Sequence, residues 1–216
     1  MRLDLATLTA GQPFCAAVVL TWHGRLALTL NDDHVPADQP RPVVRVGGVG
    51  GGQEVGETIW DCALREAHEE VGVSVDLVPA PVTRFFDHEV RELVEVDHVE
   101  DELAPLLVER WERPNPDVAY KPGLPTGPYL YGASFLARAG DAAELRPGDI
   151  LALLLLPPEL WTSLDGSTVG EVVAAGAELL EREPVAAETR LWVHPYESFR
   201  LVVPMLDEPA VRAALA

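Results

Sequence analysis

The chain has very few cysteines and lysines, and both shortages restrict what it can do. Cys15 and Cys62 are the only cysteines among 216 residues, so a disulfide framework is excluded and a cytoplasmic protein with reduced thiols is expected. Lys121 is the only lysine, and sixteen basic residues face thirty-five acidic ones, for a net charge of -19. A surface of this charge repels polymeric nucleic acids and anionic membranes, so we expect neither as a partner.

Long apolar runs are also absent. The longest, residues 150–157, has the length of a strand and is far too short to cross a bilayer. Residues 1–14 lack a basic stretch followed by an apolar one, which argues against a secretory signal. Hydrophobic residues make up 48% of the chain and charged residues 24%, so we expect a packed core in a single domain, residues 1–216.

Local patterns predict an α/β fold with a mixed β-sheet. Two β-rich runs, residues 14–22 and 25–30, are separated by a two-residue turn and indicate a hairpin. A short strand over 42–46 then leads into a glycine-rich loop, a helix and a strand over 73–78, an order typical of layered α/β folds. Further strands are predicted over 129–138, 150–156, 191–194 and 200–203, and helices over 169–180 and 209–215.

Residues 88–128 differ in composition and are predicted to be an acidic insertion with helix and loop. Residues 114–128 are rich in proline and glycine, which indicates a loop. The preceding part has apolar residues at helical spacing, namely Leu103, Leu106, Leu107, Val108 and Trp111. This stripe would be exposed unless it packed on the core or on a second copy, so we expect a flap or the arm of a homodimer. An extra metal ligand or base is a further interpretation, with Glu100, Asp101 and Glu102 as candidates.

The stretch GGQEVGETIWDCALREAHEEVG, residues 51–72, places six carboxylates in one short helix and the turn before it. Glu66, Glu69 and Glu70 stand at i, i+3 and i+4, so they share one face of the helix. Like charges on one face cost roughly a few tenths of a kcal/mol per neighbouring pair, and a bound cation would offset this cost. Three oxygen donors without thiolates or imidazoles suit Mg²⁺ or Mn²⁺ better than zinc.

The other residues of this helix have distinct predicted roles. Thr58 and Asp61 predict a capping box at its start, and Gly72 predicts a left-handed cap at its end. Arg65 lies one turn before Glu69 and can hold its carboxylate. The opposite flank carries His68, which is therefore not expected to be a ligand. The stripe that faces the core is predicted to consist of Trp60, Ala63, Leu64, Ala67 and Val71.

The spacing of the fixed residues resembles the Nudix box. It runs from Gly51 over five residues to Glu57, then over seven residues to Arg65, Glu66, Glu69, Glu70 and Gly72. The resemblance implies a Nudix-like α/β/α sandwich and a hydrolase that cleaves the diphosphate linkage of a nucleoside diphosphate derivative or a related organic pyrophosphate. It also implies a small phosphorylated substrate and Mg²⁺ or Mn²⁺ as cofactor. Members often have proline where this chain has Val49, which removes no ligand.

The resemblance also assigns roles to single residues. Glu66, Glu69 and Glu70 become metal ligands, one of them acting as base, and Glu57 becomes an auxiliary ligand. Gly51 becomes a backbone carbonyl ligand, and Arg65 an orienting partner in catalysis. A Nudix fold that binds its ligand without cleaving it, as a sensor, is the alternative that the sequence leaves open.

Substrate contacts are the least defined part of the sequence. The candidates are Arg45, Lys121, Phe85 and Tyr131, although aromatic residues on strands are more often part of the core than a platform for a base. The motifs GxGxxG and GxxxxGK are absent, which excludes dinucleotide-binding and P-loop sites. The sequence therefore leaves the substrate open.

Overall fold

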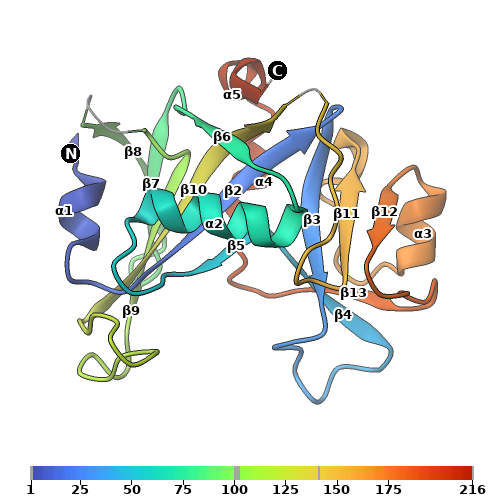
Figure 1. Cartoon of the computed structure of the whole chain (residues 1–216), viewed down its shortest axis with the longest axis horizontal. Coiled ribbons are helices and arrows are strands. Elements are labelled where there is room, and N and C mark those ends of the chain that lie inside the picture. Colours follow the sequence, from blue (N-terminus) through green and yellow to red (C-terminus); the bar gives the residue numbers. More distant parts are fainter. Residues whose placement is uncertain (1, 100–102, 141, 216) are drawn as a thin grey trace.

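The protein is described by a computed structural model over residues 2–99, 103–140 and 142–215. Within these residues, thirteen strands form one mixed β-sheet (Figure 1). Its main path follows β1 (Arg2–Leu3), β8 (Glu92–His98), β7 (Thr83–Asp87), β9 (Leu107–Glu112), β10 (Tyr129–Ala139), β2 (Phe14–Trp22), β3 (Arg25–Asn31), β11 (Ala152–Leu156) and β12 (Glu178–Glu181). Off this path, β5 (Val49–Gly52) pairs with β2, β6 (Val75–Val78) with β10, and β4 (Val43–Gly47) with β3 and β13 (Arg190–Val193).

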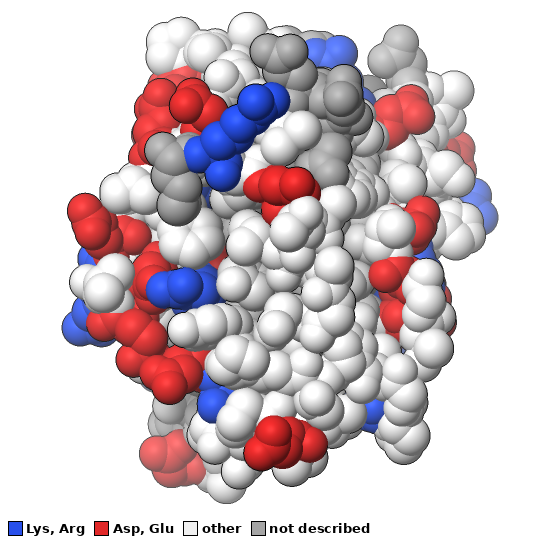
Figure 2. Space-filling model, turned by 90° about the vertical axis from the view of Figure 1, so that its left-hand side faces the viewer, with Lys and Arg blue, Asp and Glu red and all other residues white. Residues whose placement is uncertain are grey.

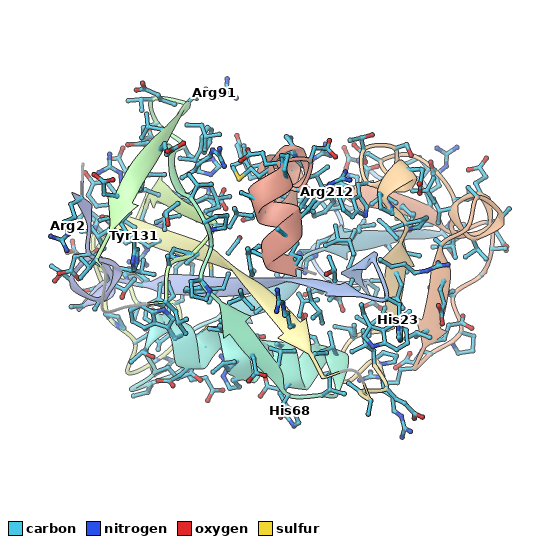
Figure 3. The ribbon with its side chains drawn as sticks, turned by 90° about the horizontal axis from the view of Figure 1, so that it is seen from above. Arg2, His23, His68, Arg91, Tyr131 and Arg212 are labelled. Carbon is cyan, nitrogen blue, oxygen red and sulfur yellow. The ribbon has the colours of Figure 1, made fainter. Side chains whose placement is uncertain are left out.

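Helices cover both faces of the sheet, as Figures 1 and 3 show. Helix α2 (Ile59–Val71) lies on one face, and α4 (Phe199–Met205) and α5 (Pro209–Leu215) lie on the other. Strand side chains alternate between two cores: Val18 and Leu20 pack in the core of the α2 face, and Val19 packs in that of the α4 face. The remaining helices are α1 (Leu5–Thr9), α3 (Val169–Ala174) and a 3₁₀ turn (Pro158–Leu160). The α/β/α sandwich predicted from the sequence is confirmed.

Most of the predicted elements are present. The hairpin of β2 and β3 pairs Thr21 with Leu26, and β4, β6, β10, β11, β13 and α5 lie where strands and a helix were predicted. Two predictions are wrong. The helix over 169–180 ends as α3 at Ala174, since Gly176 has a φ of 112° and the chain then continues as β12 along β11. Residues 200–203 belong to α4, because a short apolar run does not distinguish a strand from a buried helix.

The predicted acidic helix in residues 88–128 is also wrong, because this segment contributes strands β8 and β9. Strand β9 lies between β7 and β10, and its side chains alternate, with Leu107 in one core and Val108 in the other. Leu106, Leu107 and Val108 are 0% exposed, so most of the apolar stripe that suggested a flap or a dimer arm is part of the core, whereas Leu103 is 38% exposed. Residues 114–128 do form a loop. Glu100, Asp101 and Glu102 lie outside the described residues.

Helix α2 has the predicted ends but a slightly rotated core face. Thr58 and Asp61 form the capping box, and Gly72 ends the helix with a φ of 71°. Leu64 is 39% exposed rather than buried, whereas Cys62 is fully buried. The buried face of α2 is thus rotated toward Glu70, which accepts a hydrogen bond from the Gly50 amide.

Candidate functional site

The glycine segment, residues 47–52, comprises the last residue of β4, Gly48 and strand β5, and β5 lies directly against α2. The Gly50 amide donates a hydrogen bond of 2.7 Å to Oε2 of Glu70. A Cβ added at Gly51 would lie 2.5 Å from the Glu66 carboxylate, and one at Gly50 would lie 2.3 Å from the Ala16 carbonyl oxygen. Glycine at position 51 therefore lets the backbone approach Glu66, and glycine at position 50 lets β5 lie against β2 while its amide reaches Glu70.

Arg65 is the centre around which the other carboxylates gather. Its Nε donates to Oε1 of Glu57 at 2.6 Å, and its Nη1 donates to Glu66 and Glu69 at 2.8 Å each. Its Nη2 donates to the Gly52 carbonyl at 2.8 Å. These contacts, led by the hydrogen bond to Glu57, raise the pKa of Arg65. The contact between Arg65 and Glu69 is the one that the helical spacing predicted.

Burial changes the protonation of two of the glutamates. The Glu70 side chain is buried so deeply that its pKa is raised to about 9. The negative charges of Glu66 and Asp149 raise this pKa further, whereas the hydrogen bond from the Gly50 amide lowers it. Burial also raises the pKa of Glu66, against the opposing effect of Arg65. The hydrogen bond from Arg65 lowers the pKa of Glu57. Removal from water is thus a larger cause of the raised values than repulsion between carboxylates.

This donor set suits a hard divalent cation in its chemistry, because it offers carboxylate oxygens and the backbone carbonyls of a glycine segment. In the part of the chain that the structure describes, no three His, Cys, Asp or Glu side chains stand ready-placed around a single metal position. Arg65 is instead the cation on which Glu57, Glu66 and Glu69 converge. The donor types therefore fit a divalent ion, although in this structure the three carboxylates meet at the Arg65 guanidinium.

A further glutamate, the half-buried Glu197, was not predicted from the sequence. It precedes α4, and it accepts a hydrogen bond of 3.2 Å from the Gly48 amide and contacts Arg45 at 3.5 Å. Burial raises its pKa. A cavity of about 130 Å³ lies between Glu197 and the glycine segment, with Gly50 and Gly51 in its lining. No local pattern in the stretch HPYESF distinguishes this glutamate from a surface residue.

The substrate candidates are placed very differently. Arg45 lies at the glycine segment, where it contacts Glu197 and, at 3.5 Å, Asp33. Tyr131 is 6% exposed on β10, two strands from β5. Phe85 lies four strands away on β7, 5.9 Å from the Arg110 guanidinium, and Lys121 is exposed in the 114–128 loop. Of the four, the structure brings only Arg45 to the glycine segment.

Two wider features of the surface matter for a ligand. His68 points away from the glycine segment on the outer side of α2, as Figure 3 shows. Figure 2 shows the side that carries α1 and β8, where carboxylates lie in several patches with basic side chains beside them, around a wide uncharged area. No helix in the described ranges is long and apolar enough to span a bilayer.

Fold and site together define an α/β protein whose main helix presents a carboxylate cluster to a glycine segment. A family model described as the NUDIX domain matches residues 16–117, which contain the glycine segment and all of α2. Residues 16–117 therefore form a Nudix domain, the domain of a family of pyrophosphohydrolases. Nudix hydrolases generally use divalent metals such as Mg²⁺ and act on small phosphorylated molecules. The match also includes β8 and β9, so these strands belong to the family domain.

Solved structures with the same domain resemble the chain only distantly. A NUDIX family hydrolase from Clostridium perfringens is 14% identical, with 70% of this chain and 85% of that chain covered and a TM-score of 0.42. A NUDIX hydrolase from Nitrosomonas europaea is 13% identical, with 85% and 80% covered and a TM-score of 0.41. An ADP-ribose pyrophosphatase from Streptococcus suis is 13% identical, with 68% and 75% covered and a TM-score of 0.39. No curated protein matches the sequence. None of these likenesses assigns a substrate.

Proposed function

We propose that the chain is a metal-dependent hydrolase that cleaves the diphosphate linkage of a nucleoside diphosphate derivative or a related organic pyrophosphate. The observation that carries this proposal is the meeting of Glu57, Glu66 and Glu69 around Arg65, beside Gly51. These are the residues to which the Nudix box assigns metal binding. We further propose that residues 1–216 act as one cytoplasmic domain. A homodimer stays a prediction, although most of the apolar stripe that suggested it is buried.

The proposal assigns a separate role to each side chain of the site. Glu66, Glu69 and Glu70, with Glu57 and the Gly51 carbonyl as auxiliary ligands, would hold Mg²⁺ or Mn²⁺. A bound Mg²⁺ neutralises phosphate oxygens and lowers the pKa of a coordinated water. Arg65 orients the carboxylate of Glu69 through the 2.8 Å contact between them.

The protein's own carboxylates also move the proton. A diphosphate is a poor electrophile because its negative charge repels an anionic nucleophile, and the protein must remove a proton from the attacking water. Burial raises the pKa of Glu66, which favours this side chain as the proton acceptor, whereas Glu70, with a pKa of about 9, holds its own proton at neutral pH until a cation displaces it. Arg45, held at the glycine segment by Glu197, supplies positive charge for the phosphate groups.

A ligand sensor that binds without cleavage is the second candidate. Arg65 favours it, since this guanidinium already satisfies three carboxylates without a metal. A panel of nucleotide sugars, dinucleotides and nucleoside triphosphates separates the two candidates by mass spectrometry. The hydrolase proposal expects diphosphate cleavage with Mg²⁺ and none with a chelator. Binding of panel members without cleavage at any Mg²⁺ or Mn²⁺ concentration identifies a sensor instead.

A further inference from the structure

A cavity of about 490 Å³ lies at the end of β2 that is far from the glycine segment. The glycine segment pairs with residues 15–18 of β2, whereas this cavity is lined by Thr21 and by its partner on β10, Arg138. Figure 3 labels two further residues of the lining, His23 in the turn between β2 and β3 and Arg212 in α5. The volume is in the range of roughly 300–1,000 Å³ that is typical of small-molecule sites. The lining shares no residue with the site on α2.

The charge of this cavity is opposite to that of the chain. The described lining residues with ionisable side chains are all basic, namely His23, Arg138 and Arg212. The whole chain, by contrast, has thirty-five acidic residues and sixteen Lys and Arg. A hollow with low-dielectric walls concentrates the potential of charges of one sign, so this cavity attracts anions.

Arg138 is the principal cation of the cavity. Its Nε and Nη2 both donate to the Ala214 carbonyl oxygen, at 3.0 and 2.6 Å. These bonds orient the guanidinium without neutralising it, and in the part of the chain that the structure describes no carboxylate pairs with it. Arg212 donates from Nε to the Leu206 carbonyl at 2.9 Å and from Nη2 to Asp207 at 2.6 Å, so its charge is partly neutralised. A guanidinium that is fixed and unpaired is suited to bind an oxyanion.

Two tryptophans give the cavity aromatic walls. Trp161 is 8% exposed and donates from Nε1 to the Leu156 carbonyl at 3.0 Å. The Nε1–H group of Trp22 is buried and has no hydrogen-bond partner within residues 2–99, 103–140 and 142–215. Buried polar groups in native proteins almost always have a partner, so an exception calls for a role. Together with the apolar Leu206 and Leu215, these side chains suit a flat apolar group that carries a hydrogen-bond acceptor.

We propose that this cavity is a second ligand site, for a small organic anion in which a phosphate or carboxylate group is attached to a flat apolar body. The anionic oxygens accept hydrogen bonds from Arg138 and contact Arg212, and the apolar body packs against the tryptophan walls. The inference does not rest on the proposed function, because the cavity is separate from the carboxylates on α2.

The test uses phenyl phosphate and benzoate as probes, by calorimetry on the metal-free full chain. Each probe joins one of the two oxyanions to a flat ring, whereas inorganic phosphate lacks the ring and phenol lacks the charge. We expect at least one probe to bind more tightly than both of these controls, and the tighter probe identifies the preferred oxyanion. Binding of both probes no tighter than the controls overturns the proposal.

Nuclear magnetic resonance locates the bound probe. Binding should shift the indole N–H signals of Trp22 and Trp161, which line the cavity, and leave that of Trp60 on α2 unchanged. A shift of the Trp60 signal without any change at Trp22 and Trp161 would place the probe at α2 and contradict the proposal.

Arginine variants test the cation directly. Arg138→Gln should weaken binding of the preferred probe roughly tenfold, as expected for the loss of a hydrogen bond to a charged group. Arg212→Gln should weaken it less, because Asp207 already neutralises part of that charge. Arg146→Gln, the same charge change at an exposed residue outside the cavity, should have no effect. Arg138 is exposed, so its variant should fold normally, as circular dichroism would show. Wild-type affinity in Arg138→Gln overturns the proposal.

Discussion

Each face of the sheet brings one glutamate to the glycine segment, the buried Glu70 from one side and the half-buried Glu197 from the other. From the α2 face, Glu70 accepts from the Gly50 amide, and from the α4 face, Glu197 accepts from the Gly48 amide. Burial raises both pKa values. Their neighbours differ, because Glu70 has Glu66 beside it, whereas Glu197 has the cation Arg45. The α2 face is therefore suited to bind a cation, and the α4 face to hold the loop and an anionic ligand.

Removing a carboxylate on the α2 face should have the largest effect. Loss of an outer partner at a metal site already costs roughly 10–100-fold, so Glu69→Gln and Glu70→Gln should each lower Mg²⁺-dependent kcat roughly 10²-fold or more. The fold should persist, as circular dichroism would show. His68→Ala, an exposed change on the same helix, should be nearly silent. A variant of Glu69 or Glu70 with near-normal activity would remove that residue from the site.

Gly51→Ala should have the next largest effect, because it tests the close approach of loop and helix. The new Cβ would lie 2.5 Å from the Glu66 carboxylate, which must move away. We expect activity to fall roughly tenfold or more, as for other changes that displace a ligand. Gly52→Ala is the matched control, since a Cβ there meets nothing within 4 Å. Equal activity of the two variants would contradict the proposed role of Gly51.

Stability without metal should depend on pH through Glu70. Its pKa is about 9 in the folded chain against an ordinary value of 4.5, so the folded state keeps a proton that the unfolded state releases. The contribution of Glu70 to stability is then fully present below about pH 4.5 and is lost as pH rises toward 9. Calorimetry with a chelator should show a melting temperature that declines over this range, and Glu70→Gln should flatten the decline. A wild-type melting temperature that does not change over this pH range would contradict a buried, protonated Glu70.

Millimolar Mg²⁺ at neutral pH should raise the melting temperature by a few degrees, because the ion binds only the folded site. Calorimetry of the wild type and of Glu69→Gln measures this effect. The increase should be much smaller in the variant, since one ligand is missing. An identical increase in both proteins would place the bound ion elsewhere.

Glu197→Gln on the α4 face should have the smallest effect of these changes. The amide oxygen can still accept from Gly48, so we expect a several-fold rise in KM with little change in kcat. Steady-state kinetics measure this, and the exposed Glu159→Gln serves as a control of equal charge change. A loss of kcat as large as that of Glu70→Gln would contradict the proposed difference between the two faces of the sheet.

The difference between the two faces of the sheet also explains which features could be predicted from the sequence. The capping box of Thr58 and Asp61, the Gly72 cap and the shared face of the glutamates are local features, and all three are present. Glu197 reaches the Gly48 amide across 149 positions, a distance over which single-sequence patterns carry no information. Strand β9 was mistaken for a helix because its burial arises from its neighbours β7 and β10.

Binding of Mn²⁺, followed by electron paramagnetic resonance, tests the central claim most directly. The account predicts that the wild type binds Mn²⁺ at neutral pH, and that Glu66→Gln, Glu69→Gln and Glu70→Gln each weaken this binding roughly 10²-fold, with diphosphate cleavage lost in parallel. His68→Ala should bind as the wild type does. Absence of Mn²⁺ binding, or binding that is unchanged in all three glutamate variants, would contradict the claim that this helix holds the catalytic metal.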